Sequence, residues 1–197
     1  WYDWVYGWLW LGRNRKLKII EMFKKLAVAL VFILSSVFLN TVSHSIEPDV
    51  FVQSTVNRAA DTLGGDLSKE ERIKKLKIIA KTTVDIYGIG MYSLGSNRKN
   101  LSKDELKTYN DVFEKYFLKS FSSRLAEYSN PIIEVNSKEK INKNYTIVSS
   151  TLVATEKRPE IKIDWRIYTK NPDKPLIRDL IIEGLSLART QKEEFNS

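Results

Sequence analysis

The sequence predicts an α+β domain in which helices pack on one face of a twisted antiparallel sheet. Between residues 48 and 128, apolar residues recur at the spacing of an α-helix. From Ile132 onward the period changes to two, and short turns separate the apolar runs. Strands joined by short turns pair antiparallel, and such a sheet commonly has one covered face. Helices first and strands second indicate the α+β class.

Helices fill the first half of the expected domain. The first begins at Pro48 and stops at Gly64-Gly65, because proline favours helix starts and glycine favours ends. Ser68-Lys69-Glu70-Glu71 is a capping-box pattern, and it begins the second helix. A short buried helix is expected over 87–94. Ser102-Lys103-Asp104-Glu105 then caps the longest helix, which is expected to run to about Tyr128.

Strands and a closing helix are expected after Asn130-Pro131. The strands are predicted over 132–136, 144–155, 160–170 and 176–183. A helical pattern follows from Leu185 to Phe195, and the chain ends inside it. The sequence therefore predicts a domain that is truncated in its last helix.

Residues 22–45 have the organisation of a secretory signal peptide. Met22 is followed by Lys24 and Lys25, then by a short apolar run, and Ser43 and Ser45 occupy the −3 and −1 positions of a cleavage site. The apolar run is shorter than the roughly 20 residues that a membrane span needs. An uncleaved membrane anchor is the alternative. Export would place the protein in the periplasm of a Gram-negative bacterium.

Residues 1–21 are interpreted as translated upstream sequence that does not belong to the domain. They contain four of the five tryptophans, and the first residue is not methionine. A signal peptide is recognised at the true N-terminus, so Met22 is the expected start. An interfacial aromatic anchor is the rival interpretation. Residues 46–197 then form a single domain.

Composition excludes several kinds of site from this domain. The first 45 residues hold six basic and two acidic residues, which leaves 26 Lys and Arg against 22 Asp and Glu, a net charge of +4. This weak basicity argues against a nucleic-acid partner. Cysteine is absent, and the only histidine, His44, is removed with the signal peptide. Histidine triads, thiol nucleophiles and zinc sites are therefore excluded, and no metal or cofactor is expected.

The longest helix carries more apolar side chains than one buried face requires. Either it is clasped between the sheet and other helices, or some of its side chains line an apolar cavity that accepts an apolar ligand. The candidate cavity-wall residues are Val52, Val56, Ile79, Val84, Ile89, Met91, Leu94, Phe113, Phe117, Phe121, Tyr128, Val148, Leu152, Ile163, Trp165, Ile167 and Ile181.

The C-terminal half resembles a known family. Asp164-Trp165-Arg166, the run from Arg178 to Leu187, and Gln191 to Phe195 look like the MlaC family of periplasmic phospholipid carriers, also called the toluene-tolerance auxiliary family. Upstream, Phe51 to Gln53, Asp85 to Gly95, and Phe117 to Tyr128 match the same family in order and spacing. The resemblance covers Pro48 to Ser197.

This resemblance implies an NTF2-like fold with a deep apolar cavity and no catalysis. It implies a soluble periplasmic carrier that shuttles phospholipid between the outer and inner membranes and so maintains lipid asymmetry. The implied partners are an outer-membrane lipoprotein–porin complex and the MCE-domain ring of an inner-membrane ABC transporter. The candidate wall residues would then contact the acyl chains.

Two rival functions remain open at this stage. An enzyme on the same fold would need a carboxylate in an apolar pocket, and Asp85 is the candidate, although a helix-capping role suits it better. A ligand-free periplasmic chaperone or scaffold is the second rival. Asp164 and Arg166 are expected to be surface cross-strand charges, and Glu183 a solvated strand end. One further hypothesis concerns the basic face of the second helix, which could steer the domain toward anionic lipid or an acidic partner: Lys74, Lys75, Lys77 and Lys81.

Overall fold

The computed structural model describes residues 45–156 and 158–196. The upstream segment and nearly all of the expected signal peptide lie outside these residues, so both remain predictions. Within the described part of the chain, no helix has the length and apolar character needed to cross a membrane.

Five α-helices are described, and most match the expected ranges. They are α2 (Pro48–Gly64), α3 (Lys69–Thr83), α4 (Ile86–Leu94), α5 (Lys103–Leu125) and α6 (Leu187–Asn196), with a 3₁₀ turn η2 (Gly95–Lys99) between α4 and α5. Both capping boxes are confirmed: Ser68 and Glu71 exchange hydrogen bonds at the start of α3, and Ser102 and Glu105 do so at the start of α5. Gly95 ends α4 with a positive φ of 58°.

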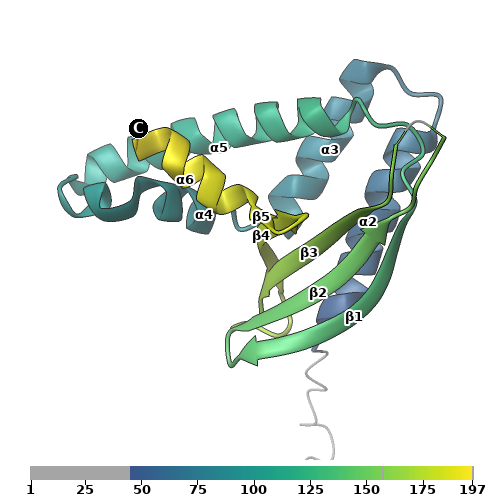
Figure 1. Ribbon diagram of the computed structural model, residues 1–197. Helices are drawn as coiled ribbons and strands as arrows, with labels where there is room; N and C mark the ends of the chain where they lie inside the picture. Colours follow the sequence, from purple (N-terminus) through teal and green to yellow (C-terminus); the bar gives the residue numbers. More distant parts are fainter. Residues whose placement is uncertain (1–44, 157, 197) are drawn as a thin grey trace, which may run out of the picture. The chain divides into compact units, whose positions relative to one another are not determined.

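Between α5 and α6, the described part of the chain forms one antiparallel sheet with its strands in chain order (Figure 1). The strands are β1 (Ile133–Asn142), β2 (Tyr145–Leu152), β3 (Ile161–Tyr168), β4 (Leu176–Ile182) and β5 (Leu185–Ser186). The predicted α+β class is confirmed. Several boundaries differ from expectation: α5 ends at Leu125 and β2 at Leu152, each about three residues early. β1 extends well beyond Asn136, because its polar second half pairs with β2. Leu185 and Ser186 pair with β4 before the last helix begins.

The strand register separates a covered face of the sheet from an open one. Val148, Trp165 and Leu180 lie opposite one another on neighbouring strands, on the covered face. Ser149, Asp164 and Ile181 share the other face. The buried side chains of β2 and β3 lie on the same face as Val148 and Trp165, because the helices pack on that face.

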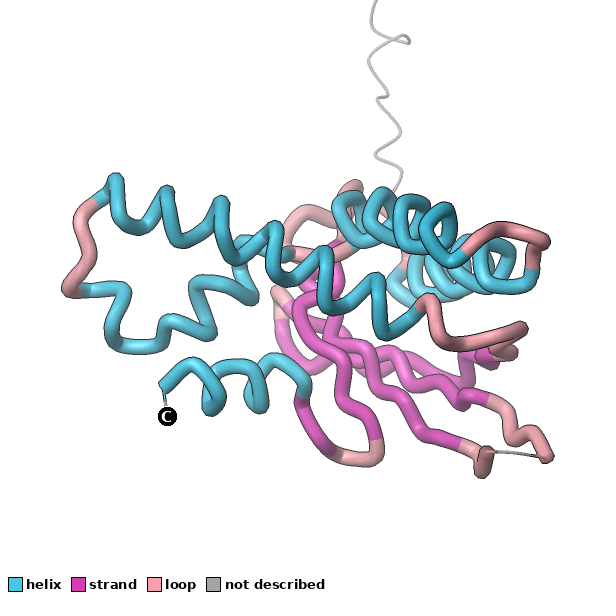
Figure 2. Tube along the Cα trace, turned by 90° about the horizontal axis from the view of Figure 1, so that it is seen from above, coloured by secondary structure: helices cyan, strands magenta, loops and turns pink. Residues whose placement is uncertain are grey.

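The helices surround the covered face from different directions. α2 packs on β1 and β2, whereas α4 and α6 lie side by side next to β4 (Figure 2). α3 and α5 run antiparallel, since Lys69 pairs with Glu127 at one end of the helix pair and Lys81 pairs with Glu114 further along. The main helical neighbours of α5 are α3 and α4, so its contacts with the sheet are made by long side chains.

Candidate functional site

One apolar cluster joins α2, α3, α4 and α5 to the covered face of the sheet. Its buried members on the helices include Val52, Ala80, Ile89 and Phe113, and its members on the sheet include Trp165. Burying such side chains gives about 1.5–3 kcal/mol each. This cluster is the centre of the fold and of the candidate site.

An aromatic ladder runs along the inner side of α5. Tyr109, Phe113, Phe117 and Phe121 follow one another at four-residue spacing, which places them on one face of the helix. The ring centroids of successive members are 5.7, 6.2 and 5.3 Å apart, all in stacked arrangements. Such aromatic pairs add about 0.5–1.5 kcal/mol beyond area burial. The ladder is therefore a stiff apolar wall.

The cluster is bordered by apolar side chains that are only half-buried. We call them the half-buried apolar set: Phe51, Tyr109, Phe117, Phe121, Ile133, Val135, Ile161 and Leu180. Three of them belong to the aromatic ladder, and four belong to β1, β3 and β4. The pairing of Ile133 and Ile161 with Leu152, and of Leu180 with Trp165, puts these strand residues on the covered face. Ladder and sheet thus present partly exposed apolar surface around the same core.

Most of the candidate wall residues meet at this cluster. Ten are buried members of it and two more are half-buried beside it: Val52, Val56, Val84, Ile89, Phe113, Val148, Leu152, Ile163, Trp165 and Ile167, with Phe117 and Phe121. The other five lie outside it. Ile181 is on the open face of the sheet, and Tyr128 is exposed after the end of α5. Ile79, Met91 and Leu94 are half-buried on the flanks of α3 and α4.

The structure adds residues that the sequence-based wall set did not include. Tyr109 stands four residues before Phe113, so the helical period alone would have placed it on the ladder. Leu180 and Ile133 reach the covered face only through strand pairing. Single-strand alternation does not reveal this face, because β4 is apolar on both sides near its end.

The polar groups within the cluster are satisfied locally. The Trp165 indole Nε1–H donates to the Ser150 hydroxyl at 2.8 Å, and that hydroxyl donates to the Ile163 carbonyl at 3.2 Å. The Tyr109 hydroxyl donates to the Gly90 carbonyl at 3.1 Å, and burial raises the pKa of this phenol. A Cβ at Gly90 would lie 2.8 Å from the Phe113 ring, so glycine permits the close approach of α4 to α5.

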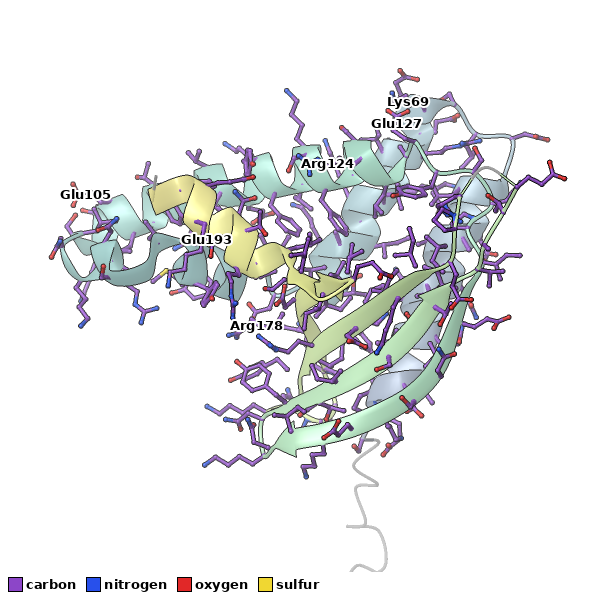
Figure 3. The ribbon with its side chains drawn as sticks, in the orientation of Figure 1. Lys69, Glu105, Arg124, Glu127, Arg178 and Glu193 are labelled. Atoms are coloured by element: carbon purple, nitrogen blue, oxygen red, sulfur yellow. The ribbon has the colours of Figure 1, made fainter. Side chains whose placement is uncertain are left out.

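Asp85, the one carboxylate considered for catalysis, is held in a structural role. It caps α4 by accepting from the Gly88 backbone N–H at 2.8 Å, and it forms an ion pair with Arg178. Arg178 is the extra residue of a β-bulge in β4. Its guanidinium also lies 4.5 Å from the centroid of the Tyr168 ring. Figure 3 shows Arg178 beneath α4 and α6.

Gly88 completes this arrangement by leaving room for the guanidinium. A Cβ at this position would lie 2.6 Å from Cζ of Arg178 and equally close to Oδ2 of Asp85. The backbone at the same junction is tied to the sheet, because the Asp85 N–H donates to the Ile177 carbonyl at 2.9 Å. The contacts among Asp85, Gly88 and Arg178 therefore fix the first turn of α4 against β4.

The last helix is held by a buried carboxylate. Asp179, only 4 % exposed, accepts from the Ser186 hydroxyl at 2.6 Å and from the Ala188 N–H at 3.0 Å. A carboxylate at a helix N-terminus is favourable because it meets the positive end of the helix dipole. At the other end of α6, the Phe195 ring lies about 6 Å from the rings of Phe113 and Tyr116.

The expected strand charges have specific partners. Asp164 accepts from the Ser149 hydroxyl at 2.6 Å, while Arg166 faces Asp179 across β3 and β4 at 3.7 Å. Glu183 accepts from the Lys162 N–H at 2.5 Å, so it closes a strand end. Among residues 45–156 and 158–196, no three acidic or histidine side chains come together as a metal site would require.

Comparison with known proteins gives a consistent picture. A family model described as MlaC protein matches residues 52–197. A search of curated proteins finds no match. Chains of solved structures do match, among them the phospholipid-binding protein from Ralstonia solanacearum, determined in complex with a phospholipid. That chain is 18% identical, and the match covers 77% of this chain and 86% of that one with a TM-score of 0.64. At this identity the likeness shows a shared fold.

Proposed function

The chain belongs to the MlaC family, and we propose that it is a carrier that binds phospholipid by its acyl chains. The observation that carries the proposal is the half-buried apolar set on α2, on α5 and on the covered face of the sheet. Acyl chains lying against this set would bury the surface that the protein leaves partly exposed. The related Ralstonia solanacearum protein holds a phospholipid.

The physical need for such a carrier is large. Burial of one methylene gives about 0.8 kcal/mol, so two chains of roughly 30 carbons in total cost on the order of 24 kcal/mol to expose to water. Transfer from a bilayer to an apolar protein interior replaces one apolar environment with another. The exchange is then nearly balanced, and its direction is set by the donor, the acceptor or an ATP-driven step elsewhere.

The family supports a more specific setting for this exchange. The protein would be exported to the periplasm by the segment 22–45. It would take phospholipid between an outer-membrane lipoprotein–porin complex and the MCE-domain ring of an inner-membrane ABC transporter, and so maintain lipid asymmetry. In this setting the protein performs no covalent chemistry. The role of Asp85 as a helix cap and ion-pair partner agrees with this assignment.

Native mass spectrometry of gently purified protein tests the proposal. A carrier should show masses increased by one or more phospholipids, which lipid extraction removes. A phospholipid-free mass from a preparation expressed in a lipid-replete cell would refute carriage. It would favour the enzyme or the scaffold.

The headgroup should matter little if the acyl chains provide the affinity. In an exchange assay with vesicles of matched chain length, phospholipids with different headgroups should load to similar extents. If the protein loaded one headgroup class and rejected the others, the result would contradict the view that acyl-chain contacts provide most of the affinity.

A further inference from the structure

The outer side of the α3–α5 helix pair carries a concentration of lysines. We define the basic face as Lys74, Lys75 and Lys77 on α3 with Lys115 and Lys119 on α5. All are exposed except Lys77, which is half-buried. Spacings of three and four residues place Lys74 and Lys77 together on α3, and Lys115 and Lys119 together on α5. α3 and α5 pack against each other, and Lys81 of α3 pairs with Glu114, the residue before Lys115, so the two stretches lie on neighbouring helices.

None of the five lysines of the basic face forms an ion pair within the described residues 45–156 and 158–196. The carboxylates that pair on this helix pair belong to other lysines, because Glu127 binds Lys69 and Glu114 binds Lys81. Lys69 and Glu127 lie together where α3 begins and α5 ends (Figure 3). The nearest carboxylate to Lys74 and Lys75 in sequence is Glu71, which accepts hydrogen bonds from Ser68 in the capping box. These hydrogen bonds, and to a smaller extent the charges of Lys75 and Lys74, lower the pKa of Glu71.

Exposed aliphatic side chains accompany these charges. Ile78 on α3 is 56 % exposed and lies four residues after Lys74, and Val112 on α5 is 59 % exposed and lies three residues before Lys115. Apolar side chains surrounded by lysines are typical of helices that lie in a lipid headgroup layer.

We propose that the basic face docks the domain on the anionic surface of a phospholipid bilayer. All five cations are lysines. The flexible ammonium group of lysine suits diffuse attraction to a charged surface, whereas the rigid guanidinium of arginine suits paired hydrogen bonds to one defined group. Each lysine close to such a surface strengthens binding by a factor of about five. This inference goes beyond cargo binding, because it concerns the outside of the helix pair and holds for loaded and empty protein.

Cosedimentation of the full chain with vesicles tests the docking surface. Vesicles of phosphatidylcholine alone are compared with vesicles that contain about 30 mol % phosphatidylglycerol, at low and at physiological salt. The K74Q/K115Q variant should partition onto the anionic vesicles roughly 25-fold less than the unchanged protein. Residues 1–44 are the same in every variant, so the difference between variants reports on the basic face.

The matched control removes two exposed lysines elsewhere. K140Q/K143Q, at the β1–β2 hairpin, makes the same change in net charge and should reduce partitioning less than about threefold. The inference is overturned if both double variants lose binding equally, or if K74Q/K115Q binds anionic vesicles as well as the unchanged protein. The second result would leave an acidic protein as the partner of the face. Phospholipid content measured on the same preparations should stay unchanged, which separates failure of docking from failure of carriage.

Discussion

Tryptophan substitutions at Leu180 and at Ile167 distinguish space that a ligand would occupy from core that is already filled by protein. Leu180 on β4 is half-buried beside Trp165, while Ile167 on β3 is fully buried. At Ile167, tryptophan must displace packed neighbours, and overpacking costs about 1–3 kcal/mol. For a domain of this size that corresponds to a fall in Tm of about 2–12 °C. At Leu180, the added ring should occupy space that an acyl chain would fill.

L180W should therefore leave the lipid-free protein nearly as stable as before, within about 0.5 kcal/mol. It should displace roughly three methylenes of bound lipid, about 2.4 kcal/mol, and so weaken retention roughly 50-fold. Thermal melts of delipidated protein give the first quantity, and mass-spectrometric lipid content gives the second. The reasoning fails if L180W lowers Tm as far as I167W does and keeps its lipid, because the space beside Leu180 would then be packed protein.

Three further predictions concern the framework around the interior. Replacing Asp85 with Asn keeps the cap of α4 but removes the charge that pairs with Arg178, and should lower the free energy of urea unfolding by about 1–2 kcal/mol. Replacing Asp85 with Ala removes the cap as well and should lower it by about 1 kcal/mol more. Equal losses for the two variants would contradict the capping role. S150A leaves the buried Trp165 N–H without its acceptor and should cost about 1–3 kcal/mol, seen as a shifted midpoint of tryptophan fluorescence. Hydrogen bonds from Ser102, the N-cap of α5, hold the pKa of Glu105 below 4.5, so the charged carboxylate stabilises the fold above about pH 4.5 and loses that effect as pH falls through its folded-state pKa. The difference in Tm between the unchanged protein and E105Q should therefore shrink between pH 7 and pH 3. A difference in Tm that stays constant over this range would refute the stabilising role of the Glu105 charge.

The elements of the fold were predictable where local signals agree. The capping boxes at Ser68 and Ser102 fixed two helix starts to the residue, because the same side chains that define the pattern make the hydrogen bonds. β1 was underestimated because Ser137 to Lys140 are polar and lack alternation. Their strand conformation comes from backbone pairing with β2, which no local pattern encodes.

The candidate site was predictable only as far as periodicity reaches. The apolar pattern of the longest helix put Phe113, Phe117 and Phe121 among the candidate wall residues, and the structure stacks their rings along one face of α5. The pattern did not identify the neighbours of that face. Leu180 joins the cluster through its register with β3, and Arg178 leaves the regular alternation through a bulge. Both depend on pairing between strands that are distant in sequence.

The polar content of the buried residues bears on what the interior can bind. Seven of the eight buried polar residues in the described part of the chain are serine or threonine, and the eighth, Asp179, is committed to the start of α6. Thr55, Thr62, Thr83 and Ser93 donate to the carbonyl four residues earlier in their own helices. The Ser122 hydroxyl has no partner, but a neutral hydroxyl offers a ligand far less than a charge does. A polar ligand would lose its hydration here without receiving equivalent hydrogen bonds, whereas an acyl chain would lose only unfavourable contact with water. This asymmetry favours an apolar tail as the bound group.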